Sequence, residues 1–124
     1  MRRSRSATQK EGASAAFFLA TVERLGLTQA LQGRIVAAES GGAVGASVEK
    51  GDLALGVLPV SEILPIAGID VAGIFPGDLP GFITMTAGVS AHATNAPAAR
   101  ELMAFLTTPA SEAVLRTRGM ERAR

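Results

Sequence analysis

The chain has 124 residues, of which 48% are hydrophobic, and a formal net charge of +1 at pH 7. That composition is too apolar for a disordered chain and suits one domain with a modest core. The balanced charge and the lack of tyrosine and tryptophan disfavour nucleic-acid binding, and the lack of cysteine excludes disulfides and thiolate chemistry.

The first element that the pattern predicts is a helix over residues 12–26, GASAAFFLATVERLG. Gly26 is a natural stop for it, because glycine readily takes the left-handed conformation that ends many helices. A further helical turn is expected within residues 28–33. Five apolar residues at helical spacing should form the buried face of the helix: Ala15, Phe18, Leu19, Val22 and Leu25.

A strand–helix–strand unit is expected next. Residues 34–39, RIVAAE, predict a short strand, and residues 42–51 predict a short helix closed by a glycine. The continuous apolar run at residues 53–58, LALGVL, is typical of a strand buried on both faces. Two strands joined by a helix in this way should run parallel with a right-handed crossover.

The second half predicts two more strands, at residues 69–75 and 82–90, and two helices. Asn95 is the expected N-cap of the first helix, and Thr108 precedes the second, which should end at Gly119. Helices alternate with strands almost throughout, so the predicted fold class is α/β, with a parallel-rich sheet flanked by helices in a single domain. The buried stripe of the first of these helices should consist of Ala99, Leu102, Met103 and Leu106.

Enzymatic chemistry finds little support in the residues. His92 is the single histidine and stands in a loop, and one histidine without cysteines is too few ligands for a metal site. Ser90, His92 and Asp70 are the residue types of a catalytic triad, but no G-x-S-x-G motif accompanies them. Glu62 could serve as a general base, yet no partner for it stands out. Since GGAVGAS matches no nucleotide-binding loop either, we expect a protein that is not an enzyme and carries no cofactor or metal.

Two glycine-rich helix starts offer a different chemistry. The first amides of a helix have no partner within it, and they carry the positive end of the helix dipole, so they favour an anion. Such starts are expected at residues 12–14 and at Gly41 and Gly42. In a parallel sheet the loops before such helices gather at the carboxyl ends of the strands, where ligands usually bind.

The order of several segments carries a family resemblance. They are GASAAFFLATVERLGL, then the glycine-opened helix followed by KGDLALGV, SEILP and IDVAG, and finally AARELMAFLTTPASEAVLRTRGME. Together, over residues 6–122, they resemble the bacterial ABC-transporter solute-binding proteins. The similarity is greatest to the molybdate-binding-like branch of the type 2 periplasmic binding fold.

The resemblance implies a protein of two α/β lobes that trap a solute between them, and this chain is similar to the second half of such a protein. Residues 6–81 resemble the second lobe. Residues 82–124 resemble the return strand and the C-terminal helices that pack on the first lobe. In molybdate binders, amides at two helix starts contact the ligand, and these contacts match Ser14 and either Gly41 or Gly42.

Two functions follow from the resemblance. The first is non-covalent binding of a small oxyanion, such as molybdate or a related anionic solute, by a solute-binding protein that serves the membrane subunit of an ABC transporter. The second is a degenerate lobe that acts as a homo-oligomeric interaction module and binds no solute. The missing half-site favours the second function, as does Pro59, which stands where a molybdate binder places a tyrosine hydroxyl on the ligand. An effector-binding domain of a transcription regulator is a third alternative, although no helix-turn-helix pattern is present.

The resemblance also bears on location and assembly. Family members are exported, which implies the periplasm, whereas no signal-peptide pattern follows Met1, so a chain that starts there is expected in the cytoplasm. The apolar stripe of AARELMAFL has no first lobe to cover it and should be exposed. We therefore expect self-association, with the terminal helices exchanged between two copies.

Overall fold

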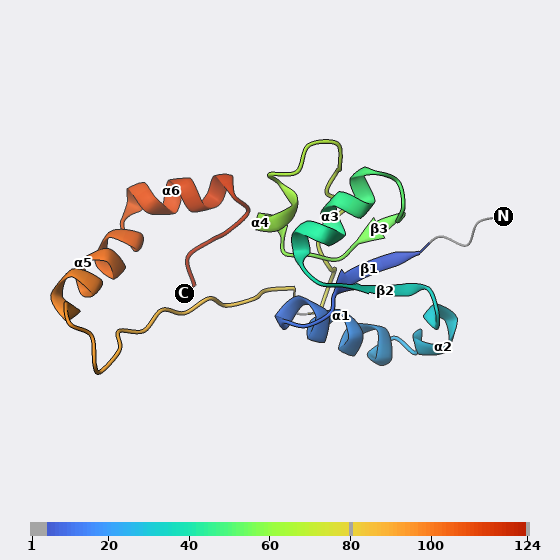
Figure 1. Ribbon diagram of the computed structural model, residues 1–124, viewed down its shortest axis with the longest axis horizontal. Coiled ribbons are helices and arrows are strands. Elements are labelled where there is room, and N and C mark those ends of the chain that lie inside the picture. The colour runs from blue at the N-terminus through green and yellow to red at the C-terminus, as the bar shows by residue number, and fades with distance from the viewer. Residues whose placement is uncertain (1–4, 80, 124) are drawn as a thin grey trace. The chain divides into compact units, whose positions relative to one another are not determined.

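The computed structural model describes residues 5–79 and 81–123 (Figure 1). The chain divides into two compact units, Met1–Ile83 and Thr84–Arg124. Among the described residues, the first unit holds three strands and four helices, and the second holds two helices. The fold is mixed α/β with a small parallel sheet flanked by helices, as the pattern of elements predicts.

The sheet has β1 (Ser6–Gln9) in its centre, between β2 (Ile35–Ala38) and β3 (Leu55–Gly56). β1 runs parallel to both neighbours and pairs over four residues with β2 and over two with β3. The predicted strands β2 and β3 are therefore parallel, but they are not neighbours because β1 lies between them. The sequence pattern misses β1, since SATQ contains one apolar side chain and follows a charged stretch.

Two helices cover opposite sides of this sheet, α1 (Ala13–Arg24) and α3 (Gly41–Glu49) (Figure 1). The core forms where α3 meets the sheet, and it joins the fully buried Val44 to Ala7 and Leu53. Gly56 of β3 allows this close approach, because a Cβ at that position would lie 2.8 Å from Val44 Cγ1. The contact between α3 and β3 therefore depends on a glycine.

The buried face of α1 differs in part from the predicted stripe. Leu19 and Leu25 are about half exposed, which corrects the prediction that they are buried. A sheet of three short strands is too narrow to cover so wide a stripe. The residues that α1 does bury are Ser14, Ala15, Phe18, Thr21 and Val22.

The strand predicted at residues 53–58 is shorter and more exposed than its pattern indicates. It contains two residues in the sheet, and Leu55 is 46% exposed. The prediction of burial on both faces is wrong because α3 packs on the face of β3 to which Gly56 belongs, while Leu55 on the opposite face stays exposed. Two one-turn helices complete this unit, α2 (Thr28–Leu31), which confirms the predicted further turn, and α4 (Val60–Ile63).

The strands predicted at residues 69–75 and 82–90 are not formed in the structure. Both segments are irregular chain, and Ile74 and Phe82 are exposed. A strand needs a neighbour for its backbone hydrogen bonds. A sequence that favours strand therefore stays irregular where the chain supplies no neighbour, and that is the physical reason for both corrections.

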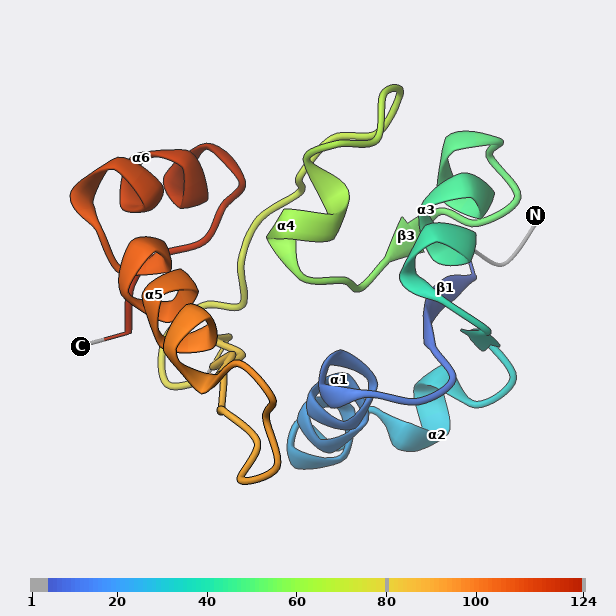
Figure 2. The same cartoon turned by 60° about the vertical axis from the view of Figure 1, so that its left-hand side comes forward.

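The second unit consists of α5 (Ala96–Leu106) and α6 (Pro109–Thr117), drawn in orange and red in Figure 2. Both predicted caps are confirmed. Asn95 Oδ1 accepts a hydrogen bond from the third helical amide of α5 at 3.2 Å, and Thr108 Oγ1 accepts the equivalent bond in α6 at 3.3 Å. Gly119 follows α6 with a φ of 68°, as a helix stop requires.

The apolar stripe of α5 is not buried. No residue of α5 is buried, so the prediction that Ala99, Leu102, Met103 and Leu106 form a buried stripe is wrong. The expectation that the stripe is exposed without a first lobe is confirmed at Leu102 and Leu106. Since α5 and α6 are two short helices, they cannot enclose a core of their own. No helix within the described residues has the length and apolar character needed to cross a membrane. The exposed large apolar side chains of α5 are Leu102, Phe105 and Leu106.

Candidate functional site

The two helix starts predicted to hold a ligand lie at one edge of the sheet. α1 follows β1 and α3 follows β2, and these strands are parallel neighbours. Both helices therefore begin beyond the carboxyl ends of adjacent strands. The backbone amide of Lys10 donates to the carbonyl of Ala38 at 2.6 Å, which ties the two loops together at this edge.

The start of α1 has no side-chain cap. Its N-cap is Gly12, whose φ of 112° is a conformation that favours glycine. Ala13 and Ser14 are its first two residues, and the burial of Ser14 holds this start against the rest of the unit. Because the first amides of a helix have no partner within it, the N–H groups of Ala13 and Ser14 can donate hydrogen bonds to a ligand.

The start of α3 is capped by Ser40, whose Oγ accepts a hydrogen bond from the amide of Ala43 at 3.2 Å. Gly41 is buried and Gly42 is exposed. A Cβ at Gly42 would meet nothing closer than Ser40 Oγ at 3.9 Å, so the space beside this residue is open. Since the cap uses the amide of Ala43, the amides of Gly41 and Gly42 are the ones that helix geometry leaves for a ligand.

One side chain, that of Gln9 at the end of β1, reaches both helix starts. Its Oε1 lies 3.4 Å from the Cβ position of Gly12, and its Nε2 lies 2.7 Å from the Cβ position of Gly41. A single carboxamide thus spans the separation between the first turns of α1 and α3. The sequence pattern misses Gln9 because it misses the strand that Gln9 ends.

The carboxylate of Glu62, from α4, lies against the start of α3. Its Oε2 accepts a hydrogen bond from Gln9 Nε2 at 3.0 Å, and a Cβ added at Gly41 would collide with the same oxygen. A negative group is stabilised at the positive end of a helix dipole. Glu62 therefore lies beside the helix start at which an anionic ligand of the Gly41 amide would bind. Its exposed side chain is free to turn into solvent.

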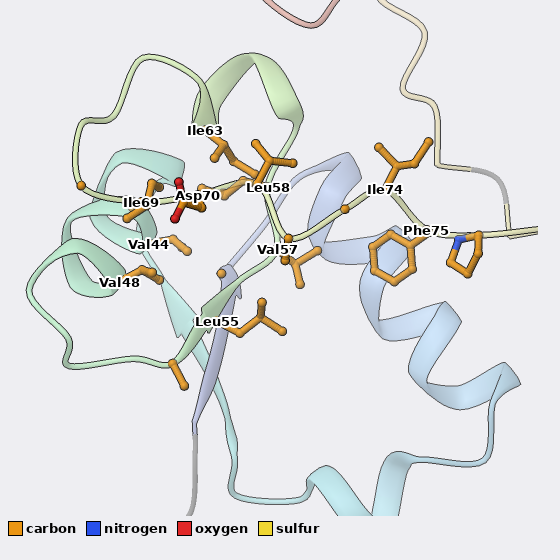
Figure 3. Close-up of a pocket in the computed structure, with 18 residues that line it drawn as sticks. Val44, Val48, Leu55, Val57, Leu58, Ile63, Ile69, Asp70, Ile74 and Phe75 are labelled. Atoms are coloured by element: carbon orange, nitrogen blue, oxygen red, sulfur yellow. The ribbon is translucent and has the colours of Figure 1, made fainter.

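A hollow of about 560 Å³ lies elsewhere in the first unit, between α3, β3 and residues 68–76 (Figure 3). Asp70 is the one charged residue in its lining, and Ser14, Gly41 and Gly42 do not line it. The candidate amides and this hollow are therefore separate features. Apolar side chains from several elements surround the hollow in Figure 3, among them Val44, Val48, Leu55, Ile63 and Ile69.

The described residues contain no group of three or more histidine, cysteine or carboxylate side chains that could hold a metal ion. Ser90 Oγ accepts a hydrogen bond from the backbone amide of His92 at 3.1 Å, which is a contact within one turn. A serine nucleophile needs instead a bond to the histidine ring. The proximity of Ser90 and His92 is thus explained by the geometry of this turn.

A family profile described as "Bacterial extracellular solute-binding protein" matches residues 4–121. Because the match spans nearly the whole chain, the chain belongs to this family of bacterial extracellular solute-binding proteins. No curated protein and no solved structure matches the chain. Membership of the family assigns a solute-binding role. It does not identify the solute, for which the geometry of the site is the guide.

Proposed function

We propose that this chain binds a small oxyanion, such as molybdate or a related anionic solute, without forming a covalent bond. The observation that supports this most is the reach of Gln9 to two helix starts at once. Amides at Ser14 in α1 and at Gly41 or Gly42 in α3 donate to the oxygen atoms of the solute. The dipoles of both helices favour its negative charge, so no basic side chain is required.

Binding requires Glu62 to leave the start of α3. Two negative groups at one helix start repel each other, so the carboxylate turns into solvent as the solute enters. Gln9 Nε2 then loses its bond to Glu62 and has its hydrogens free for a solute oxygen. Glu62 is in this way an internal competitor, which lowers the affinity of the site for anions.

The chain contributes one half of a two-lobed site in this proposal. Residues 6–81 form the lobe that carries the amides, and residues 82–124 form the part that returns to a first lobe and packs on it through α5 and α6. The first lobe closes over the solute, and the closed protein delivers it to the membrane subunit of an ABC transporter from the periplasm. The role is binding and delivery, with no catalytic step and no cofactor.

Thermal melts of the chain with molybdate, tungstate, sulfate and phosphate test the proposal. A solute at ~100 times its dissociation constant adds about 2.7 kcal/mol of stability, which in a unit of this size raises the melting temperature by about 10 °C or more. Gly42→Ala should abolish the rise, because its methyl group enters the open space beside the amide. Gly88→Ala is the matched control, since nothing lies within 4 Å of its Cβ position. The absence of a rise with all four anions would overturn anion binding.

A second function, a homo-oligomeric interaction module that binds no solute, is favoured by different observations. Pro59, the N-cap of α4, carries no hydroxyl group to offer a ligand. The exposed apolar side chains of α5 are typical of a surface that a partner covers. Sedimentation separates the two functions. An assembled chain without any response to anions supports the module, and a monomer that binds an anion contradicts it.

A further inference from the structure

The carboxylate of Glu62 is held at the candidate site by groups that carry no full charge. Gln9 Nε2 donates a hydrogen bond to its Oε2 at 3.0 Å, and the same oxygen lies against Gly41 at the start of α3. The helix start attracts this carboxylate through its dipole. Because that attraction depends on the negative charge, it is lost when Glu62 takes up a proton.

The other charged groups near this edge of the sheet belong to loops and to the far end of α3. Lys10 and Glu11 follow β1, and Glu39 follows β2. Lys10 Nζ lies 3.7 Å from Glu39 Oε1, and both of these side chains are more than half exposed. Glu49, the last residue of α3, is the one charged residue of that helix. Of these groups, Glu62 is the one that the structure brings against the first turn of α3.

A proton on Glu62 changes the effect of this side chain on a solute. The ionised carboxylate competes with an oxyanion for the start of α3 and has to turn away before the solute enters. A protonated carboxyl group has no charge that repels the solute, and its O–H can donate a hydrogen bond. It can therefore stay beside Gln9 and donate to an oxygen atom of the solute.

We infer, on the basis of the proposed function, that the site takes up a proton together with the oxyanion and that Glu62 holds this proton. The occupied site then binds more protons than the empty site. By linkage, the affinity for the oxyanion rises as the pH falls, and the rise is complete once Glu62 is protonated in the empty site as well. Acidification thus strengthens binding, and a return to neutral pH favours release.

The expected size of this effect follows from the attraction that the proton abolishes. A carboxylate at a helix start is stabilised by an amount equivalent to about a 2- to 5-fold change in affinity. A total rise of that size, spread over the titration of one group, corresponds to about 0.2–0.4 proton taken up per solute where the rise is steepest. Glutamate side chains in general take up their proton around pH 4–5, which sets the range to examine.

Sulfate is the probe for the first test, because it stays a dianion over this range whereas molybdate and phosphate take up protons themselves. Its affinity for the native chain and for Glu62→Gln is measured at about pH 7 and at about pH 4.5, with circular dichroism to verify the fold at each pH. Glu62→Gln should bind sulfate about 2- to 5-fold more tightly at neutral pH. That ratio should fall towards 1 in acid, because the native chain then loses its competitor too.

The comparison of the two chains separates Glu62 from the general effect of acid, which makes the whole protein more positive and strengthens anion binding by both. A ratio that stays constant while sulfate binds would overturn the inference and leave anion binding in place. Absence of sulfate binding at both pH values would overturn it as well, and the melts with the other anions then decide the proposed function separately.

Calorimetry then counts the proton directly. Sulfate is titrated into the chain at about pH 4.5 in two buffers with different heats of ionisation, and the difference between the observed heats gives the number of protons taken up. The native chain should take up about 0.2–0.4 proton per sulfate, and Glu62→Gln should take up little or none.

Two carboxylates outside the site provide the matched controls for this count. Glu39→Gln removes a carboxylate at the end of a neighbouring strand, and Glu49→Gln removes the one at the far end of α3. Both variants should take up the same fraction of a proton as the native chain. Uptake that persists in Glu62→Gln, or that disappears in Glu39→Gln instead, would place the proton on another group and overturn the assignment to Glu62.

Discussion

Replacing Glu62 by glutamine should raise the affinity for an oxyanion while it lowers the stability of the chain without solute. A carboxylate at the start of a helix contributes about 0.3–1 kcal/mol, so the melting temperature should fall by about 1–8 °C. The same change removes the carboxylate that must leave the helix start before the solute enters. Displacing it costs the same amount, about 0.3–1 kcal/mol, so the affinity should rise by about 2- to 5-fold.

Isothermal titration with molybdate measures the affinity of Glu62→Gln, and thermal melts without solute measure its stability. Glu49→Gln is the matched control, because Glu49 is the last residue of α3 and lies at the opposite, negative end of the helix. The control should leave the affinity unchanged and should not lower the stability. Weaker anion binding by Glu62→Gln, or an equal gain by both variants, would refute the role of Glu62 as a competitor.

Two further substitutions test the packing and the helix caps. Gly56→Ala should destabilise the chain by about 1–3 kcal/mol, because its Cβ would lie 2.8 Å from Val44 Cγ1; a urea midpoint equal to that of the native chain would contradict the close packing of α3 on β3. Asn95→Ala should cost the second unit about 1 kcal/mol through loss of the α5 cap, and Asn95→Ser should retain most of it. Equal losses in the two Asn95 variants, measured by circular dichroism during denaturation, would show that the cap bond is not the cause.

The parts of this fold that the sequence predicts have local causes. The helices α1, α3, α5 and α6 follow from apolar spacing and from caps such as Asn95, whose partner lies three residues away. The strands depend on neighbours instead. β1 is a short, mostly polar strand that forms because β2 and β3 flank it, whereas residues 69–75 pair with no strand among the described residues and stay irregular. Periodicity contains no information about such partners.

The candidate site divides in the same way. Ser14, Gly41 and Gly42 can be predicted as possible contacts because glycine-rich helix starts are visible in the sequence. Gln9 and Glu62 cannot be predicted as a pair, since their hydrogen bond joins residues 53 positions apart in the chain. Their placement depends on the packing of α4 near the start of α3, which is a property of the folded unit. The position of Glu62 at the site thus depends on tertiary packing, and no local sequence motif predicts it.

The sharing of one solute by the first turns of α1 and α3 is tested most directly by nuclear magnetic resonance. In a titration of ¹⁵N-labelled chain with molybdate, the amide signals of Ser14 and of Gly41 or Gly42 should shift together and fit one dissociation constant. The amide of Gly88, in the second unit, should not move. Amides at the two helix starts that stay in place, or that follow two different dissociation constants, would contradict a common site.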